Sequence, residues 1–83
     1  MDLKSNEERW AVWTVQARNF ARRQNYTDAV ARMKLVRDAV RASLQEASDQ
    51  KVRERLERHL ARAEEQLGEL SAQYDAWRSE IAA

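Results

Sequence analysis

Proline is absent from the chain, and glycine occurs once, at Gly68. These two residues end most helices and form most tight turns, so their scarcity favours long helices with short connections. Ala, Glu, Arg, Leu and Gln, which have high helix propensity, dominate the sequence. A chain of 83 residues has room for one domain, which we expect to be all-α and to span 1–83. A domain this small is often stabilised by oligomerisation or by a partner.

Apolar residues recur at spacings of three and four in three stretches, the pattern of amphipathic helices. We expect helices over about 6–23, 27–47 and 50–81. Their stripes are Trp10, Trp13, Ala17 and Phe20; Val30, Met33, Val36, Val40, Leu44 and Ala47; and Val52, Leu56, Leu60, Ala63, Leu67, Leu70, Tyr74, Trp77 and Ile81. The middle stripe is widened, as two neighbouring helices require, by Ala29, Leu35, Ala39 and Ala42. Short connections make adjacent helices antiparallel, which predicts an antiparallel three-helix bundle with a long C-terminal helix.

Polar residues mark the expected helix ends. Ser5 followed by Glu8 fits a capping box at the start of the first helix. Asn25 tolerates the left-handed backbone that ends many helices, and Thr27 can then cap the second one. Either residue of the pair 48–49, a serine and an aspartate, can cap the third helix.

The third predicted helix is longer than the other two by about ten residues, or about 15 Å at a rise of about 1.5 Å per residue. The last three turns of this helix carry Tyr74, Trp77 and Ile81. We expect the first two helices to end before they reach these side chains, so that nothing covers them. An exposed apolar line with two aromatics is a candidate contact surface, with the alternative that the end folds back or frays. From Leu60 onward the spacing is that of a heptad seam, which a second copy of this helix could cover. Gly68 inside it marks a candidate kink or end.

The sequence offers little for catalysis or metal binding. Cysteine is absent, which excludes disulfides, thiolate nucleophiles and cysteine metal sites. His59 is the only histidine, and its neighbours Glu57 and Arg58 point away from it on a helix. Glu54 stands five residues before His59, which is not the spacing of a helical metal pair. We therefore expect no enzyme, no cofactor and no metal.

Charge is unevenly placed, although the net charge is only +1. The segment 18–41 is basic, and the segment 64–80 is acidic. The basic face could bind an acidic partner, or one copy could join another head to tail. The interpretation we favour is that the acidic segment neutralises the basic one inside the bundle. The near-neutral balance argues against nucleic acid, and no apolar run could span a membrane, so we expect a cytoplasmic protein.

Two stretches resemble the MIT (microtubule interacting and trafficking) domain. The first, 19–31, has an Asn-Tyr pair between two helices, followed by an alanine at Ala29. The second is His59-Leu60-Ala61-Arg62-Ala63-Glu64, which is similar to the family's aromatic-Leu-x-Arg-Ala-Glu motif. The resemblance covers roughly 10–70, and the tetratricopeptide hairpin resembles only its first part. His59 stands where the family usually has tyrosine, and Leu67 comes one residue later than the family's next leucine.

The resemblance implies a three-helix bundle whose grooves receive helical peptides. It implies that the groove between the second and third helices is lined by Leu60 and Glu64, an apolar anchor and a carboxylate one turn on. Ordinary core packing for Leu60 and a solvated Glu64 remain the alternative. We expect an MIT-like adaptor that binds an amphipathic helix of another protein. The expected partner-binding residues are Leu60, Glu64, Leu67, Tyr74, Trp77 and Ile81. The alternatives are a coiled-coil subunit that associates with itself through its last helix, and a small helical chaperone or inhibitor.

Overall fold

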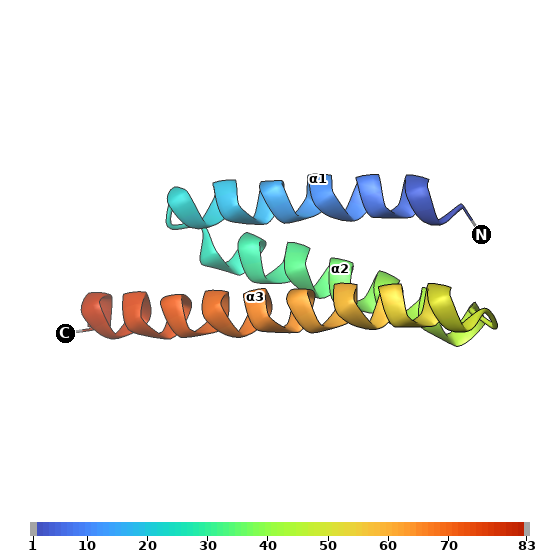
Figure 1. The fold of residues 1–83 in the computed structure, drawn as a ribbon. Helices are drawn as coiled ribbons and strands as arrows, with labels where there is room; N and C mark the ends of the chain where they lie inside the picture. The colour runs from blue at the N-terminus through green and yellow to red at the C-terminus, as the bar shows by residue number, and fades with distance from the viewer. Residues whose placement is uncertain (1, 83) are drawn as a thin grey trace.

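A computed structural model describes residues 2–82, and within this range it contains three helices and no strand. Helix α1 spans Leu3–Arg22, α2 spans Tyr26–Glu46 and α3 spans Gln50–Ala82. Each helix runs antiparallel to the next, so α1 and α3 point in the same direction (Figure 1). The molecule is elongated, with extents of 51 × 17 × 14 Å. The predicted all-α, antiparallel three-helix bundle with a long C-terminal helix is confirmed.

Helix α1 begins three residues earlier than predicted, because Asp2 rather than Ser5 is its N-cap. The Asp2 carboxylate accepts hydrogen bonds from the Ser5 backbone N–H at 3.2 Å and the Ser5 hydroxyl at 2.7 Å. These bonds lower the pKa of Asp2. The predicted capping box of Ser5 and Glu8 is therefore wrong. The extra turn brings Leu3 against the core, which favours the earlier start.

The turn between α1 and α2 contains the only described non-glycine residue with a positive φ, Gln24 at 62°. The Gln24 N–H donates to the Ala21 carbonyl, and the Asn25 N–H donates to the Phe20 carbonyl. This pair of bonds is the Schellman arrangement that closes a helix end. The sequence predicted Asn25 in the left-handed position, one residue too late.

Asn25 instead caps α2, and the predicted cap, Thr27, lies inside the helix. The Asn25 side chain accepts from the Asp28 N–H at 3.4 Å and donates to the Asp28 carboxylate at 2.7 Å. This places Asp28 in the first turn, where its charge suits the positive end of the helix dipole.

Asp49 caps α3, one of the two residues that the sequence offered. Its carboxylate accepts from the Lys51 and Val52 N–H groups at 2.8 and 3.2 Å. The preceding helix end is also closed by a side chain. The Arg53 guanidinium donates to the Leu44 and Ala47 carbonyls, each at 2.9 Å, and so satisfies acceptors that the end of α2 leaves free.

The core lies along α2 and follows the predicted stripes. Its buried apolar members are Trp10, Ala17, Ala29, Met33, Val36, Val40, Leu56, Ala63 and Leu70. Phe20 and Leu60, two members of the predicted stripes, are half-buried at its edge. Leu35 and Ala42 are exposed, so the second stripe is narrower than predicted. The reason is that the side of α2 facing away from both neighbours is left to solvent.

Helix α3 passes through Gly68 without ending there and extends past the α1–α2 turn (Figure 1). A Cβ placed on Gly68 would meet no atom within 4 Å. This glycine therefore serves no close approach between helices, and the end or kink considered from the sequence does not interrupt the helix.

Candidate protein-binding channel

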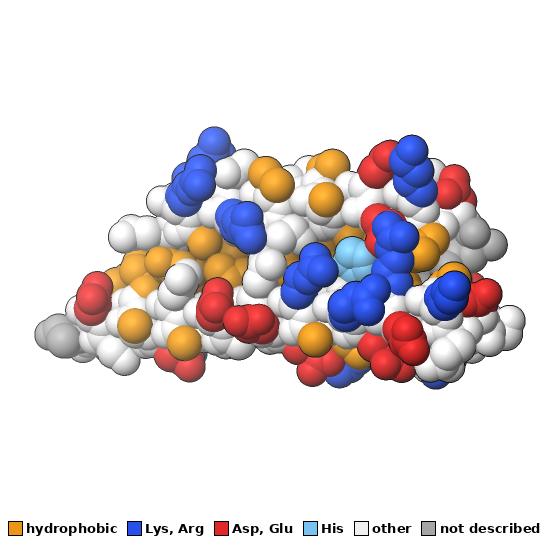
Figure 2. All heavy atoms as spheres, viewed as in Figure 1, with side chains coloured by type: hydrophobic (Ala, Val, Ile, Leu, Met, Phe, Trp, Pro, Cys, Tyr) orange, Lys and Arg blue, Asp and Glu red, His pale blue; other side chains and the backbone are white. Residues whose placement is uncertain are grey.

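Helices α1 and α3 both pack on α2 but make few close backbone approaches to each other. A depression with a volume of about 270 Å³ lies between α1 and α3. Its floor is formed by three residues of α2, Met33, Val36 and Val40, of which none is more than 4% exposed. Figure 2 shows apolar side chains between α1 and α3, mainly toward the end of α3, and basic side chains beside His59. We call this depression the α1/α3 channel.

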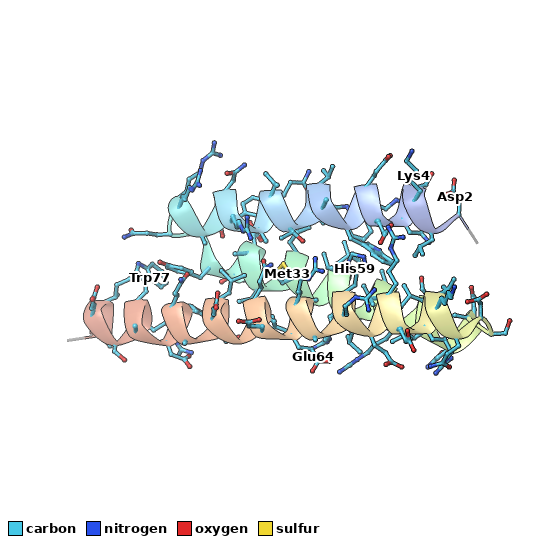
Figure 3. The ribbon with its side chains drawn as sticks, viewed as in Figure 1. Asp2, Lys4, Met33, His59, Glu64 and Trp77 are labelled. Atoms are coloured by element: carbon cyan, nitrogen blue, oxygen red, sulfur yellow. The ribbon has the colours of Figure 1, made fainter. Side chains whose placement is uncertain are left out.

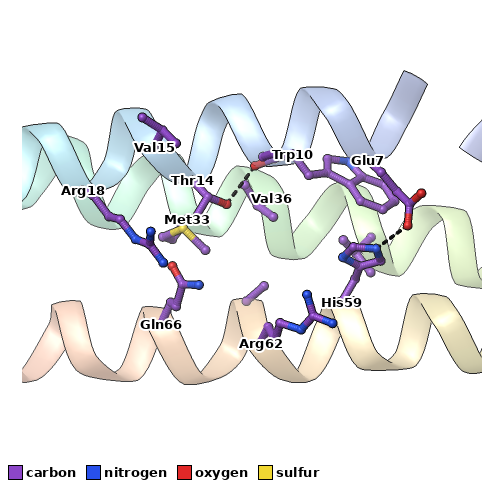
Figure 4. A pocket seen from close by; sticks show the side chains of 13 residues that line it. Glu7, Trp10, Thr14, Val15, Arg18, Met33, Val36, His59, Arg62 and Gln66 are labelled. Atoms are coloured by element: carbon purple, nitrogen blue, oxygen red, sulfur yellow. Dashed lines mark hydrogen bonds and ion pairs between the residues drawn. The ribbon is translucent and has the colours of Figure 1, made fainter. Parts of the chain in front are cut away.

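The walls of the α1/α3 channel add polar groups at its rim. Thr14 and Arg18 lie on the α1 side, and Arg62 and Gln66 lie opposite them on α3 (Figure 4). The Thr14 hydroxyl donates to the Trp10 carbonyl at 2.8 Å, so its hydrogen is already used. Both arginines are exposed, and no carboxylate within residues 2–82 lies at ion-pair distance from either.

One end of the channel is closed by side chains that join α1 to α3. The Glu7 carboxylate accepts two hydrogen bonds from Arg55, each at 2.7 Å, and contacts His59 Nε2 at 2.5 Å. The Trp10 ring meets the His59 ring edge-on, with centroids 5.4 Å apart. Burial of Glu7 opposes its ionisation, but hydrogen bonds from His59 and Arg55 outweigh burial and lower its pKa below 4.5. This cluster therefore holds a charged carboxylate at the closed end.

His59 lies at the boundary between the core and the surface, with a side chain 25% exposed. Its partner, Glu7, is 52 residues away in the chain, and adjacent residues gave no sign of it. The two ring contacts fix the orientation of the imidazole and tie the start of α1 to the middle of α3.

The structure separates three of the predicted partner-binding residues, Leu60 and Glu64 of the expected α2/α3 groove and Leu67. Leu60 and Leu67 are half-buried and pack on the core. Glu64 points to the other side of α3 from α1 (Figure 3) and approaches Arg41 of α2 at 4.0 Å. Both charged side chains are about half exposed, so this ion pair contributes little to the stability of the fold. The core contacts of the two leucines leave only part of their surface to a partner.

The end of α3 is better covered than the sequence suggested. Tyr26, the first residue of α2, lies with its ring centroid 6.3 Å from Tyr74 and 5.6 Å from Trp77. Both α3 aromatics are consequently half-buried, and Arg78 lies over the outer side of Tyr74, 5.5 Å from its centroid. Ile81 alone stays exposed, at 65%. The expectation that all three lacked cover is wrong for the two aromatics, because α2 begins with a tyrosine at this level.

Charge neutralisation inside the bundle is limited. Within the described residues, the only ion pair joining the basic segment 18–41 to the acidic segment 64–80 is Arg41–Glu64. Neutralisation by direct ion pairs is therefore limited to this contact, and the favoured interpretation, that the segments neutralise each other, stays a prediction at longer range. Arg18 and Arg62 were not predicted as site residues. The signal that could have found them is their position beside the apolar stripes of two helices that both neighbour α2.

Comparisons with protein-family models, with curated proteins and with solved structures give no match for this chain. Among the described helices none is long and apolar enough to cross a membrane. Residues 2–82 hold no group of three side chains that could bind a metal ion.

Proposed function

We propose that this protein is a helix-binding interaction module and that the α1/α3 channel receives an amphipathic helix of its partner. The observation that carries the proposal is the depression above α2 between two helices that approach each other mainly through the side chains of Glu7 and Trp10. Burying such a surface is favourable by about 25 cal/mol per Å². Laying a helix in an apolar groove is a common mode of peptide recognition.

The arrangement of the helices explains why a helix is the fitting occupant. In a four-helix bundle each helix packs on two neighbours and stands diagonally across from the third. Here α2 is the shared neighbour of α1 and α3, which approach each other less closely than either approaches α2. A helix in the channel would occupy the fourth position and contact both. Its apolar side chains, spaced three and four residues apart, would reach Met33 and Val36.

An MIT-like adaptor remains the family-level form of this proposal. The resemblance placed the groove between α2 and α3, at Leu60 and Glu64, whereas the proposal places it between α1 and α3. The support for this choice is the depression that Arg18 and Arg62 line between α1 and α3, whereas Leu60 packs on the core.

Self-association through α3 is the second candidate function. It is favoured by one observation, the exposure of Ile81 at the end of the seam. It predicts a dimer in sedimentation that Ile81→Ala weakens without changing the melting temperature.

The test of the channel uses three synthetic helices of about 18 residues, or about five turns, that share one leucine face. They differ only in the flanking positions, which carry Glu, Lys or Gln. Titrating each into ¹⁵N-labelled protein should shift the amide signals of Ala11, Thr14 and Val36. Failure of all three helices to bind would overturn the proposed function.

A matched pair of variants assigns the binding to the channel. Ala11 is exposed and lines the channel, whereas its exposed neighbour Val12 does not. Ala11→Trp should fill the channel and weaken binding at least about tenfold, an effect the size of a lost hot-spot contact. Val12→Trp should leave the affinity unchanged. Equal affinities of the two variants would place the helix elsewhere, and circular dichroism would check that both remain folded.

A further inference from the structure

We infer that the helix received by the α1/α3 channel is acidic, with carboxylates beside its apolar face. This inference rests on the proposed function and specifies the chemistry of the partner. Arg18 and Arg62 stand on opposite walls of the channel, on α1 and α3 (Figure 4). A helix lying between the walls would bring its flanking positions to both guanidinium groups at once.

The charges around the channel leave an excess of positive charge. Glu7 is the one carboxylate among the lining residues. Its two oxygens are already occupied by Arg55 and His59 at the closed end. Arg18 and Arg62, in contrast, have no carboxylate partner within residues 2–82.

A partner that covers the channel removes water from both arginines. Covering a charged group without an opposite charge is costly, because its hydration is lost without replacement. A carboxylate replaces that hydration through charge-assisted, often paired hydrogen bonds to the guanidinium group. A neutral apolar helix would gain the same floor contacts but would lack this compensation, and a basic helix would add repulsion.

A second copy of this chain fits the channel less well. Its acidic segment 64–80 has the right charge, but the large apolar side chains there are turned inward. Tyr74 and Trp77 pack against Tyr26, and this leaves mainly Ala72, Ala76 and Ile81 exposed. Alanines offer little surface to a floor of methionine and valines, so the partner is a different protein that carries larger apolar residues.

The experiment compares the Glu, Gln and Lys helices in calorimetric titrations at low and at physiological salt. The Glu helix should bind about tenfold more tightly than the Gln helix at low salt, with a smaller ratio at higher salt. The variant Arg18→Glu/Arg62→Glu should reverse the order, so that the Lys helix binds best.

The matched control is Lys4→Glu/Arg58→Glu, which makes the same charge change on the same two helices. Both residues are exposed and neither lines the channel, and Lys4 points away from α3 (Figure 3). This control should keep the preference for the Glu helix. If it removed the preference as fully as the channel variant does, the selectivity would come from net charge and the inference would be overturned.

Three further outcomes separate the possibilities. Equal affinities for the three helices would overturn the acidic partner and leave the helix-binding function standing. Failure of all three to bind would overturn both. Sedimentation of the protein alone as a dimer, with a monomer mass for Arg18→Glu/Arg62→Glu, would assign the channel to a second copy and contradict a separate partner.

Discussion

Leu56 is the residue on which the packing of α3 against the core depends most directly. Its side chain is fully buried, and it belongs to the predicted stripe of the third helix. Leu56→Ala should lower the free energy of unfolding by about 2–5 kcal/mol, because it removes buried methyl groups and leaves a cavity. Leu35→Ala on the exposed side of α2 should stay within about 0.5 kcal/mol. Urea unfolding of the two variants checks this, and equal midpoints would contradict the described facing of α3.

Glu7 gives the molecule an acid-sensitive contact between α1 and α3. Since its folded-state pKa is lowered below 4.5, its contribution to stability is present above about pH 4.5 and is lost as the pH falls through the folded value. The stability difference between wild type and Glu7→Gln should therefore shrink on acidification. Glu8→Gln, at an exposed neighbouring position without an ion pair among the described residues, serves as the control. A difference that is constant between pH 6 and about pH 3 would show that the carboxylate charge does not matter.

At the scale of the helices, the single glycine lies where the backbone does not need it. Gly68 is exposed in the interior of α3, and a Cβ there meets open space. Gly68→Ala should stabilise the protein by about 0.5–1 kcal/mol, because alanine loses less backbone entropy in a helix. Thermal unfolding checks the sign. A lower melting temperature would mean that this face of α3 packs against something, for example a second copy.

Gln24 has the opposite mismatch, since it holds the positive φ that glycine adopts most easily. Gln24→Gly should relieve strain of about 1 kcal/mol and stabilise the α1–α2 turn. Arg23→Gly, one residue earlier and at a negative φ of −92°, should destabilise instead. If both variants were destabilised equally, the turn would not have its left-handed residue at position 24.

These turns show where prediction from the sequence succeeded and where it failed. The stripes gave the three helices and most of the core, because burial depends on apolar periodicity. The caps were wrongly placed at Ser5 and Thr27, because Asp2 and Asn25, three and two residues earlier, accept the same capping hydrogen bonds. The left-handed position was missed because it fell on a glutamine, which carries no turn signal.

At the scale of the whole molecule, the prediction of three antiparallel helices was sound but did not specify how open the bundle is. Periodicity predicts which face of a helix is buried, and not whether the first and third helices touch. The link between Glu7 and Arg55 spans 48 residues, and no pattern in the sequence indicated it. The contacts of Tyr26 with Tyr74 and Trp77 were not predicted for the same reason, so the end of α3 was expected to be more exposed than it is.

The openness of the bundle predicts that a bound helix stabilises it strongly. An 83-residue domain buries only about 60% of its unfolded surface, and a helix bound in the channel would add to this burial. A ligand that binds only the folded state at 100 times its Kd adds about 2.7 kcal/mol. For a domain of this size that corresponds to a rise in melting temperature of about 10–20 °C.

Thermal unfolding followed by circular dichroism, with and without the Glu helix, measures this rise. Arg18→Glu/Arg62→Glu should melt near the wild-type temperature when alone, because both side chains are exposed, and should lose most of the rise. Lys4→Glu/Arg58→Glu should keep it. A Glu helix that binds but lowers the melting temperature would be binding the unfolded chain, and the channel of the folded bundle would then not be its site.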